Sequence, residues 1–277
     1  MALSVAFYVL SIMNKISIIT VNRNNAEGLE KTIRSVIEQT YPNFEFILID
    51  GDSTDNSVEI IKKYSDKITY WVSEKDTGIF NAMNKGIRKS EGDYCHFLNS
   101  GDSFFSPDTL KQIFENREYD APFINGNQIN DFGSHQQKVP CLNRPLTLYD
   151  FYWGTIKHQA TFIRRSLFDI YGLYDENLKI ISDWKFFLQT IGLHNEQPAF
   201  VDIDIVIFEW NGMSTDPQFV EKHKKERQQV LDELVPKSLQ IDYEHLHELG
   251  NYQYIANAMK RSKFLNFIVR GLVKIFG

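Results

Sequence analysis

Strands and helices are expected to alternate along the first hundred residues, and this alternation constrains the fold more than any other feature of the sequence. Short apolar runs rich in β-branched residues, such as 16–21 and 44–49, are typical of strands buried on both faces. The expected elements are a strand at 16–21, a helix at 29–37, a strand at 44–49, a helix at 58–64, a strand at 68–72, a helix at 79–87 and a strand at 93–98. This rhythm builds a mostly parallel sheet with flanking helices, so the sequence predicts an α/β fold.

The pattern loosens after residue 105, but the sequence does not divide there into separate domains. Apolar runs at 160–163 and 200–208 favour further strands, and residues 182–191 have the periodicity of a helix. We find neither an internal repeat nor a low-complexity linker, so the two halves are expected to share one core. The expected organisation is an N-terminal extension at 1–12, a first half at 13–105, a second half at 106–215 and a helical C-terminal extension at 216–277.

The first twelve residues are apolar but too short to span a bilayer, and they have neither a basic start nor a small-residue cleavage site. Met13 follows directly and leads into the first expected strand. We therefore expect the folded domain to begin at Met13. An amphipathic membrane anchor is the alternative interpretation of residues 1–12.

The composition is that of an ordinary globular protein, with 43% apolar and 24% charged residues. A net charge of -6 argues against a nucleic-acid partner, because phosphate binding requires an excess of Lys and Arg. Cys95 and Cys141 form no metal-binding or redox spacing. Since Cys95 lies in an apolar run, it is predicted to be a buried thiol, and no oxidising compartment is implied.

Small polar and acidic residues follow three of the expected strands. The first strand ends at Thr20–Asn22, the second runs into the acidic stretch 50–57, and the fourth runs into Asn99–Asp102. Because ligands of parallel sheets bind outside the carboxyl ends of the strands, these groups are expected to meet at one edge. Carboxylates there can bond ribose hydroxyls or a base edge, or bind a hard cation. A turn that caps the next helix explains a single acid such as Asp55, but it does not explain all three strand ends.

The order and spacing of these segments resemble the family 2 glycosyltransferases, which have the type A glycosyltransferase fold. The resemblance runs from Lys15 to about Ser214. Its segments are 16–22, 49–55, 74–86, 98–102, 158–165 and 182–184. It implies an enzyme that takes a sugar from a nucleotide-sugar donor, with residues 13–105 binding the donor and residues 106–215 binding the acceptor.

The resemblance also implies which residues bind the donor. Asp52 would hold the nucleoside, Asp76 would face the base or ribose, and Gly78 would let the backbone come close to the ligand. The implied donor-binding residues are Thr20, Asn22, Asp52, Asp76, Asn84, Asn99 and His158. For His158, which would contact a phosphate or the acceptor, a structural histidine with satisfied hydrogen bonds is the alternative.

After the fourth strand the family has a metal-binding acid motif, from which this sequence departs. Asn99 stands at the usual first acid position, so Asp102 is the implied metal ligand. The Asn99 amide oxygen can still bind Mg²⁺ or Mn²⁺, or the ribose. A set of oxygen ligands suits these hard ions, and the donor diphosphate would complete much of the shell.

The catalytic base of the family lies in a short acidic motif at the start of a helix, which corresponds here to Ser182-Asp183. Inverting transfer requires a base within hydrogen-bond reach of the acceptor hydroxyl, and a carboxylate is sufficient. Asp183 is therefore the implied base. Without the resemblance, an acid in the first turn of a helix is explained by the helix dipole alone.

Two further segments bear on partners. Residues Asn211–Ser214 resemble the loop that closes the donor site in relatives. The tail from Lys260 mixes basic and apolar residues, which favours contact with an anionic membrane surface. Packing of this tail on the domain or on a second subunit, as in a homodimer, is the alternative.

The sequence thus predicts a metal-dependent, inverting glycosyltransferase that uses a nucleotide sugar, with UDP as the expected nucleotide. The resemblance implies a saccharide or lipid-linked acceptor in bacterial surface polysaccharide synthesis, and a cytoplasmic enzyme on the inner face of the membrane. A nucleotidyltransferase would require a Gly-rich loop after the first strand, and residues 20–25 contain Arg23 but no glycine. A donor-binding relative without catalysis is the third reading, motivated by Asn99 and the shortened motif at 182–183.

Overall fold

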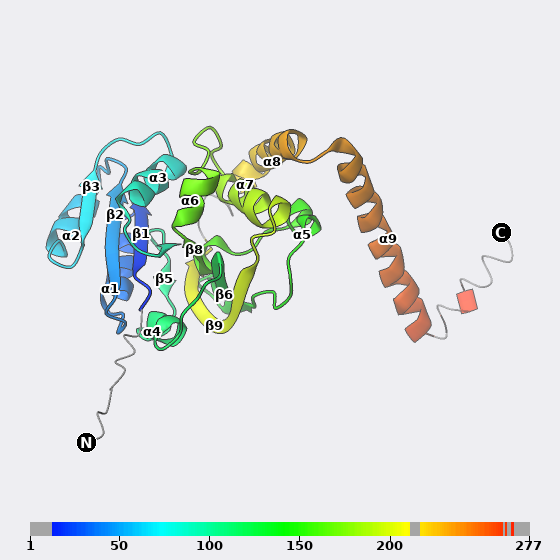
Figure 1. Cartoon of the computed structure of the whole chain (residues 1–277), viewed down its shortest axis with the longest axis horizontal. Coiled ribbons are helices and arrows are strands. Elements are labelled where there is room, and N and C mark those ends of the chain that lie inside the picture. The colour runs from blue at the N-terminus through cyan, green and yellow to red at the C-terminus, as the bar shows by residue number, and fades with distance from the viewer. Residues whose placement is uncertain (1–12, 211–216, 263, 265–266, 269–277) are drawn as a thin grey trace, which may run out of the picture. The chain divides into compact units, whose positions relative to one another are not determined.

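A computed structural model describes residues 13–210, 217–262, 264 and 267–268 (Figure 1). The chain forms two compact units, one ending at Arg227 and the other beginning at Gln228. The predicted extension at 1–12, the predicted closing loop 211–214 and most of the predicted membrane-binding tail lie outside the described residues. No helix within the described ranges is both long enough and apolar enough to cross a membrane.

The predicted alternation of strands and helices in the first hundred residues is confirmed. Strands pair in parallel in the order β3-β2-β1-β4, and a helix connects each strand to the next along the chain, as parallel pairing requires. The elements are β1 (Ile16–Asn22), α1 (Ala26–Ile37), β2 (Phe44–Asp50), α2 (Ser57–Lys63), β3 (Tyr70–Ser73), α3 (Ile79–Lys89) and β4 (Tyr94–Phe97).

The same sheet continues into the second half of the chain, where pairing becomes mixed. From β4 the order continues β8-β6-β9-β5, with β8 antiparallel to both of its neighbours and β6 parallel to β9. These strands are β5 (Ser103–Phe104), β6 (Phe123–Asp131), β7 (Gln136–Val139), β8 (Thr161–Arg164) and β9 (Pro198–Glu209). The predicted α/β class is confirmed, and the strands of the two halves lie in one sheet.

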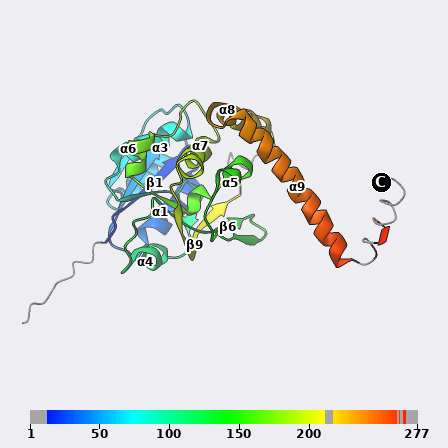
Figure 2. The same cartoon turned by 45° about the vertical axis from the view of Figure 1, so that its right-hand side comes forward.

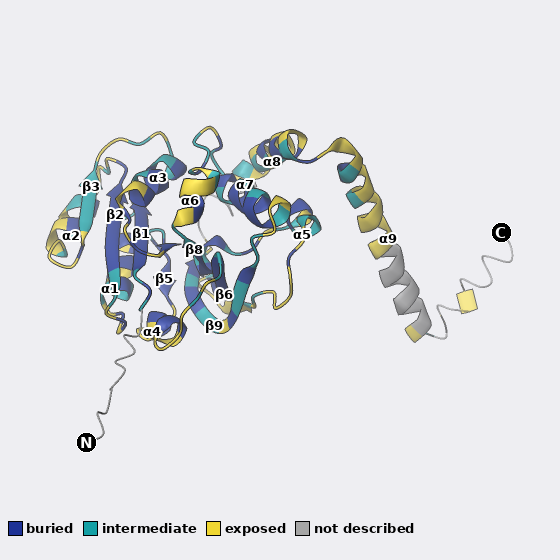
Figure 3. Cartoon of the chain, viewed as in Figure 1, coloured by how far each residue is buried: buried dark blue, intermediate teal, exposed yellow. Residues whose placement is uncertain are grey.

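Helices cover both faces of the parallel strands, as Figure 2 shows for α1 and α3 on opposite sides of β1. Alternate residues of a strand point to opposite faces. Ile16 and Ile18 of β1 join a core cluster that contains the buried face of α1. On the other face Ile19 meets Gly86 of α3, where a Cβ atom would clash with the isoleucine side chain. Two-sided covering explains why β1 is buried along its whole length (Figure 3), and Cys95 of β4 is buried as predicted.

The remaining helices lie in the second half of the chain. The predicted helix at 182–191 is present as α7 (Ser182–Phe187), which continues into a π-helical turn, η2 (Leu188–Leu193). The predicted helical C-terminal extension contains α8 (Val220–Leu234), preceded by the 3₁₀ turn η3 (Pro217–Phe219). The other helices are α4 (Thr109–Phe114), α5 (Leu148–Trp153), η1 (His158–Ala160), α6 (Ser166–Tyr171) and α9 (Lys237–Arg261).

Candidate active site

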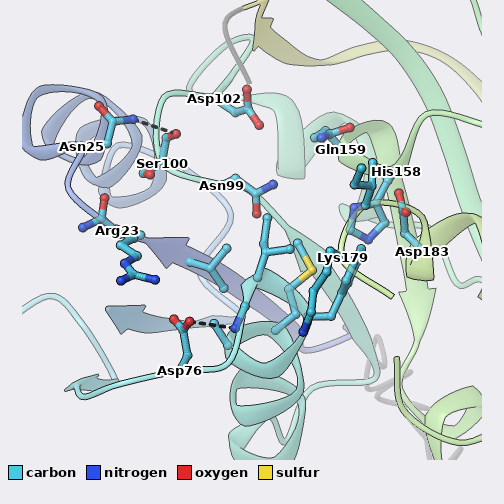
Figure 4. A pocket seen from close by; sticks show the side chains of 18 of the residues that line it. Arg23, Asn25, Asp76, Asn99, Ser100, Asp102, His158, Gln159, Lys179 and Asp183 are labelled. Atoms are coloured by element: carbon cyan, nitrogen blue, oxygen red, sulfur yellow. Dashed lines mark hydrogen bonds between the residues drawn. The ribbon is translucent and has the colours of Figure 1, made fainter. Parts of the chain in front are cut away.

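A cavity of about 580 Å³ opens at the carboxyl ends of β1 and β4 (Figure 4). Its walls come from the end of β1, the start of α3, the turn after β4, η1, the segment before α7 and the end of β9. The predicted site residues that line it are Asn22, Asp76, Asn99, Asp102, His158 and Asp183. Strand ends thus meet at one edge as the sequence predicted, and they meet around a hollow large enough for a nucleotide-sized ligand.

Asn22 contributes a free acceptor to the cavity wall. Its Nδ2 donates to Asp50 Oδ1 at 2.7 Å, whereas its buried Oδ1 has no partner among the described residues. A buried acceptor without a partner is costly unless a ligand or water supplies a donor. Thr20 lies outside the lining, and its hydroxyl donates to the carbonyl of Leu98 at 2.7 Å. Thr20 therefore holds β1 to the end of β4.

The buried acid at the end of β2 is Asp50. Its side chain accepts hydrogen bonds from Asn22, from the backbone and hydroxyl of Ser53, and from the hydroxyl of Ser73 at 2.6 Å. A carboxylate with this many donors is fixed in one orientation. Asp50 thus organises the strand ends around the cavity, a role that the sequence did not indicate.

Asp52 is exposed and does not line the cavity. Its backbone φ of 60° lies in the left-handed region, which residues other than glycine rarely adopt. The neighbouring Gly51 leaves room for the carboxylate of Asp76, since a Cβ atom at residue 51 would clash with Asp76 Oδ2. Asp76 therefore occupies the cavity wall beside β2, and nucleoside binding by Asp52 stays a prediction.

At the start of α3, the backbone turns sharply so that Asp76 and the helix both face the cavity. Gly78 adopts a φ of 141°, and its N–H donates to Asp76 Oδ1 at 3.0 Å. Further along α3, Asn84 is buried and outside the lining. Its amide bonds both the backbone of Tyr174 and the carboxylate of Glu176. Asn84 thus ties α3 to the segment that leads into α7.

The turn after β4 brings two oxygen-bearing side chains to the cavity. The Asn99 Oδ1 is buried and has no partner among the described residues. Asp102 is only 4% exposed, and its Oδ1 accepts the backbone N–H of Glu209 at 3.1 Å. Burial raises the pKa of Asp102 to about 7, and the nearby Glu209 carboxylate acts in the same direction. A cation would relieve this cost by favouring the ionised form.

Asp183 lines the opposite side of the cavity, next to His158 (Figure 4). Burial raises the pKa of Asp183 to about 6, against the opposing effects of the Trp184 N–H and of His223. His158 Nε2 lies 2.9 Å from the hydroxyl of Tyr174, and burial lowers the histidine pKa to about 3. His158 is thus neutral at physiological pH, and it faces the cavity as a polar wall.

The cavity is also lined by two cationic side chains that were not predicted from the sequence, Lys179 and Arg23. Lys179 Nζ donates to the backbone carbonyls of Thr77 and Glu176, at 3.1 and 3.0 Å. Arg23, just after β1, is exposed on the opposite wall. Neither lies in a recognisable motif, and only the fold brings Lys179 next to the loop before α3.

The profile of Glycosyl transferase family 2 matches residues 17–170 of this chain. The chain belongs to this family. The chain is therefore an enzyme of the glycosyltransferase class. The residues matched include the end of β1, the start of α3, the turn after β4 and η1, which form most of the cavity wall.

Named relatives agree with this assignment. The chain is 35% identical over 183 residues to "Uncharacterized glycosyltransferase Rv1514c" of Mycobacterium tuberculosis, covering 63% of this chain and 68% of the relative. It is 28% identical over 212 residues to "PGL/p-HBAD biosynthesis glycosyltransferase Rv2957" of the same organism, covering 70% and 76%.

Solved structures share the fold of this glycosyltransferase. The Staphylococcus aureus TarS structure in complex with UDP superposes with a TM-score of 0.60 at 22% identity, covering 70% of this chain. The match spans 60% of that solved chain. The mannosyltransferase PcManGT from Pyrobaculum calidifontis, in complex with GDP-Man and Mn²⁺, gives a TM-score of 0.55 at 14% identity, covering 78% of this chain and 61% of the other. These likenesses confirm the predicted fold.

Proposed function

We propose that this glycosyltransferase transfers a sugar with inversion from a nucleotide sugar, with UDP as the nucleotide, to a saccharide or lipid-linked acceptor. The proposal is based on the groups that line the cavity. They are two amide oxygens without a partner among the described residues, two cationic side chains and one carboxylate that could act as a base, namely Asn22, Asn99, Arg23, Lys179 and Asp183. TarS was solved with UDP and with UDP-GlcNAc, and a curated relative is named for PGL/p-HBAD biosynthesis.

The nucleoside would lie between the ends of β1 and β2. The unpartnered Oδ1 of Asn22 suits a base that presents an N–H, as uracil does at N3. Asp76 beside Gly51 would accept from a ribose hydroxyl. The diphosphate would then reach Lys179 and Arg23, whose charges match its own.

The residues after β4 fit a hard divalent cation, Mg²⁺ or Mn²⁺. Asn99 and Asp102 offer an unpartnered amide oxygen and a buried carboxylate, which are ligands of the type these ions prefer. The described residues contain no cluster of three or more His, Cys, Asp or Glu that could hold a metal without other ligands. The donor diphosphate is therefore needed to complete the shell. When bound, the metal would neutralise charge on the leaving diphosphate.

Asp183 would remove the proton of the acceptor hydroxyl. The acceptor oxygen forms a bond to the anomeric carbon, while the bond from that carbon to the phosphate oxygen breaks and the nucleoside diphosphate leaves with the electron pair. A pKa of about 6 leaves Asp183 mostly ionised at neutral pH yet basic enough to accept a proton. Neutral His158 beside it adds no charge of its own to this side of the cavity.

We further propose that the acceptor is a component of a bacterial surface polysaccharide or glycolipid, and that the enzyme works on the cytoplasmic face of the membrane. Nucleotide sugars are made in the cytoplasm, and lipid-linked acceptors lie at the membrane surface. The basic and apolar tail from Lys260 would contact anionic lipid there.

The test is donor turnover by wild type, by Asp183→Asn and by a matched control. Asp169→Asn changes an exposed acid on α6 that pairs with Arg165, four residues earlier in the chain. With Mn²⁺ and a panel of UDP-sugars, wild type and the control should release UDP at similar rates, and Asp183→Asn should release it far more slowly. If wild type binds UDP but releases none from any donor with any acceptor, the transferase proposal fails.

A further inference from the structure

The segment from Lys179 to Asp183 carries one cation and the proposed base into the cavity, and a single side chain of α8 holds its backbone. Glu226 Oε1 accepts the N–H of Lys179 at 3.0 Å, and Oε2 accepts the N–H of Ile180 at 3.0 Å. Glu226 is 8% exposed and does not line the cavity. A buried carboxylate with both oxygens engaged by adjacent N–H groups fixes the path of that backbone.

The neighbouring Arg227 holds the other end of the same segment. Its guanidinium lies 4.3 Å from the ring of Trp184, the residue that follows Asp183. It donates to the carbonyls of Phe151 and Gly154, and the Trp184 indole N–H donates to the same two carbonyls. The segment is therefore held on both sides of Asp183 by consecutive residues of α8.

The position of Lys179 depends on this hold. Its side chain reaches across to the carbonyl of Thr77 at 3.1 Å, in the loop before α3, and this leaves Nζ at the cavity wall. Release of the Lys179 and Ile180 N–H groups would let the backbone shift. A shift of an ångström or less is sufficient to misplace both a phosphate-binding cation and a general base.

We propose that Glu226 is a positioning residue for sugar transfer, acting from outside the cavity by fixing Lys179 against the donor diphosphate and Asp183 against the acceptor hydroxyl. This inference rests on the proposed function. It extends the site to α8, which lies beyond the residues matched by the family profile.

The test variant is Glu226→Gln, because glutamine keeps the size of the side chain but has one acceptor oxygen. Its amide N–H₂ then faces one of the two backbone N–H groups. The matched control is Glu221→Gln on the same helix, since Glu221 is exposed and its ion pair among the described residues is with Lys224, three residues later. We expect Glu226→Gln to lower kcat and raise the donor KM, with kcat/KM reduced by about 10- to 100-fold. The control should match wild type.

A second readout does not depend on activity. Hydrogen–deuterium exchange should become faster in Glu226→Gln at peptides that cover residues 179–184, and stay unchanged in the sheet. If exchange rises while kcat and KM stay at wild-type values, the residue is structural only and the inference is overturned. If neither changes, the inference is also overturned.

If circular dichroism shows that Glu226→Gln does not fold, the same measurements are made on Glu226→Asp, which keeps the charge but has a side chain shorter by one methylene. The same fall in kcat/KM and rise in exchange are expected, and wild-type values overturn the inference. If the wild-type protein turns over no donor, the proposed function has failed. The exchange measurement still tests the structural part of the inference: unchanged exchange at residues 179–184 in the variant would show that Glu226 does not fix this segment.

Discussion

Replacing Asp183 by asparagine should slow sugar transfer and at the same time stabilise the protein above pH 6. Burial raises the pKa of Asp183 from the ordinary 3.8 to about 6, so an ionised Asp183 is disfavoured in the folded state. Since each unit of pKa shift corresponds to about 1.36 kcal/mol, keeping Asp183 ionised in the folded state costs up to about 3 kcal/mol. The cost is smaller to the extent that water screens the half-buried side chain. Asparagine removes this cost while keeping the shape.

The size of the effect depends on pH. Because the folded pKa lies above the unfolded value, the destabilisation is fully present above pH 6 and is lost as pH falls towards 3.8. The variant should therefore melt several degrees higher than wild type at pH 8, and the difference should vanish near pH 4. Thermal unfolding followed by circular dichroism over this range measures it, with Asp169→Asn as the control.

Activity should move in the opposite direction. Loss of the general base should lower kcat by about 100- to 10,000-fold. In wild type, kcat should rise with pH through about 6 as Asp183 ionises. If Asp183→Asn is less stable than wild type at pH 8, or transfers sugar at the wild-type rate, the assignment of a buried base at this position is refuted.

Three other substitutions probe the donor side of the cavity. Gly51→Ala should displace the Asp76 carboxylate and weaken UDP binding about tenfold, as measured by calorimetry, without lowering the melting temperature. UDP binding as tight as in wild type would contradict this. Lys179→Met should weaken UDP binding more at low than at high ionic strength, because the lost contact is a charge pair; an effect independent of salt would argue against it. Asp102→Asn should raise the Mn²⁺ concentration needed for half-maximal activity, and an unchanged titration curve would remove Asp102 from the metal site.

The sequence predicts the first half of the fold well because local patterns determine it. Buried strands such as β1 and β2 are continuous apolar runs, and the helices between them have a clear period. The second half is predicted less completely. The two-residue strand β5 and the exposed strand β7 have no apolar pattern, so they depend on pairing with β9 and β6.

The site shows the same limit. Asn99 and Asp102 were predicted because they follow a strand, and Asp183 was predicted from the family resemblance; all three line the cavity. The sequence did not single out Asp50, which is buried while Asp52 is exposed, because a sequence does not show which acid of a turn points inward. Lys179 reaches the cavity because the fold brings it beside Thr77, which lies 102 residues earlier in the sequence.

Calorimetric titration of the wild-type protein with UDP, with and without Mn²⁺, tests the central claim most directly. The account predicts saturable binding of one UDP per chain that weakens when Mn²⁺ is removed, because Asn99 and Asp102 need the diphosphate to complete a metal shell. Folded protein that binds neither UDP nor another nucleoside diphosphate at millimolar concentration, with Mn²⁺ or Mg²⁺ present, would contradict it.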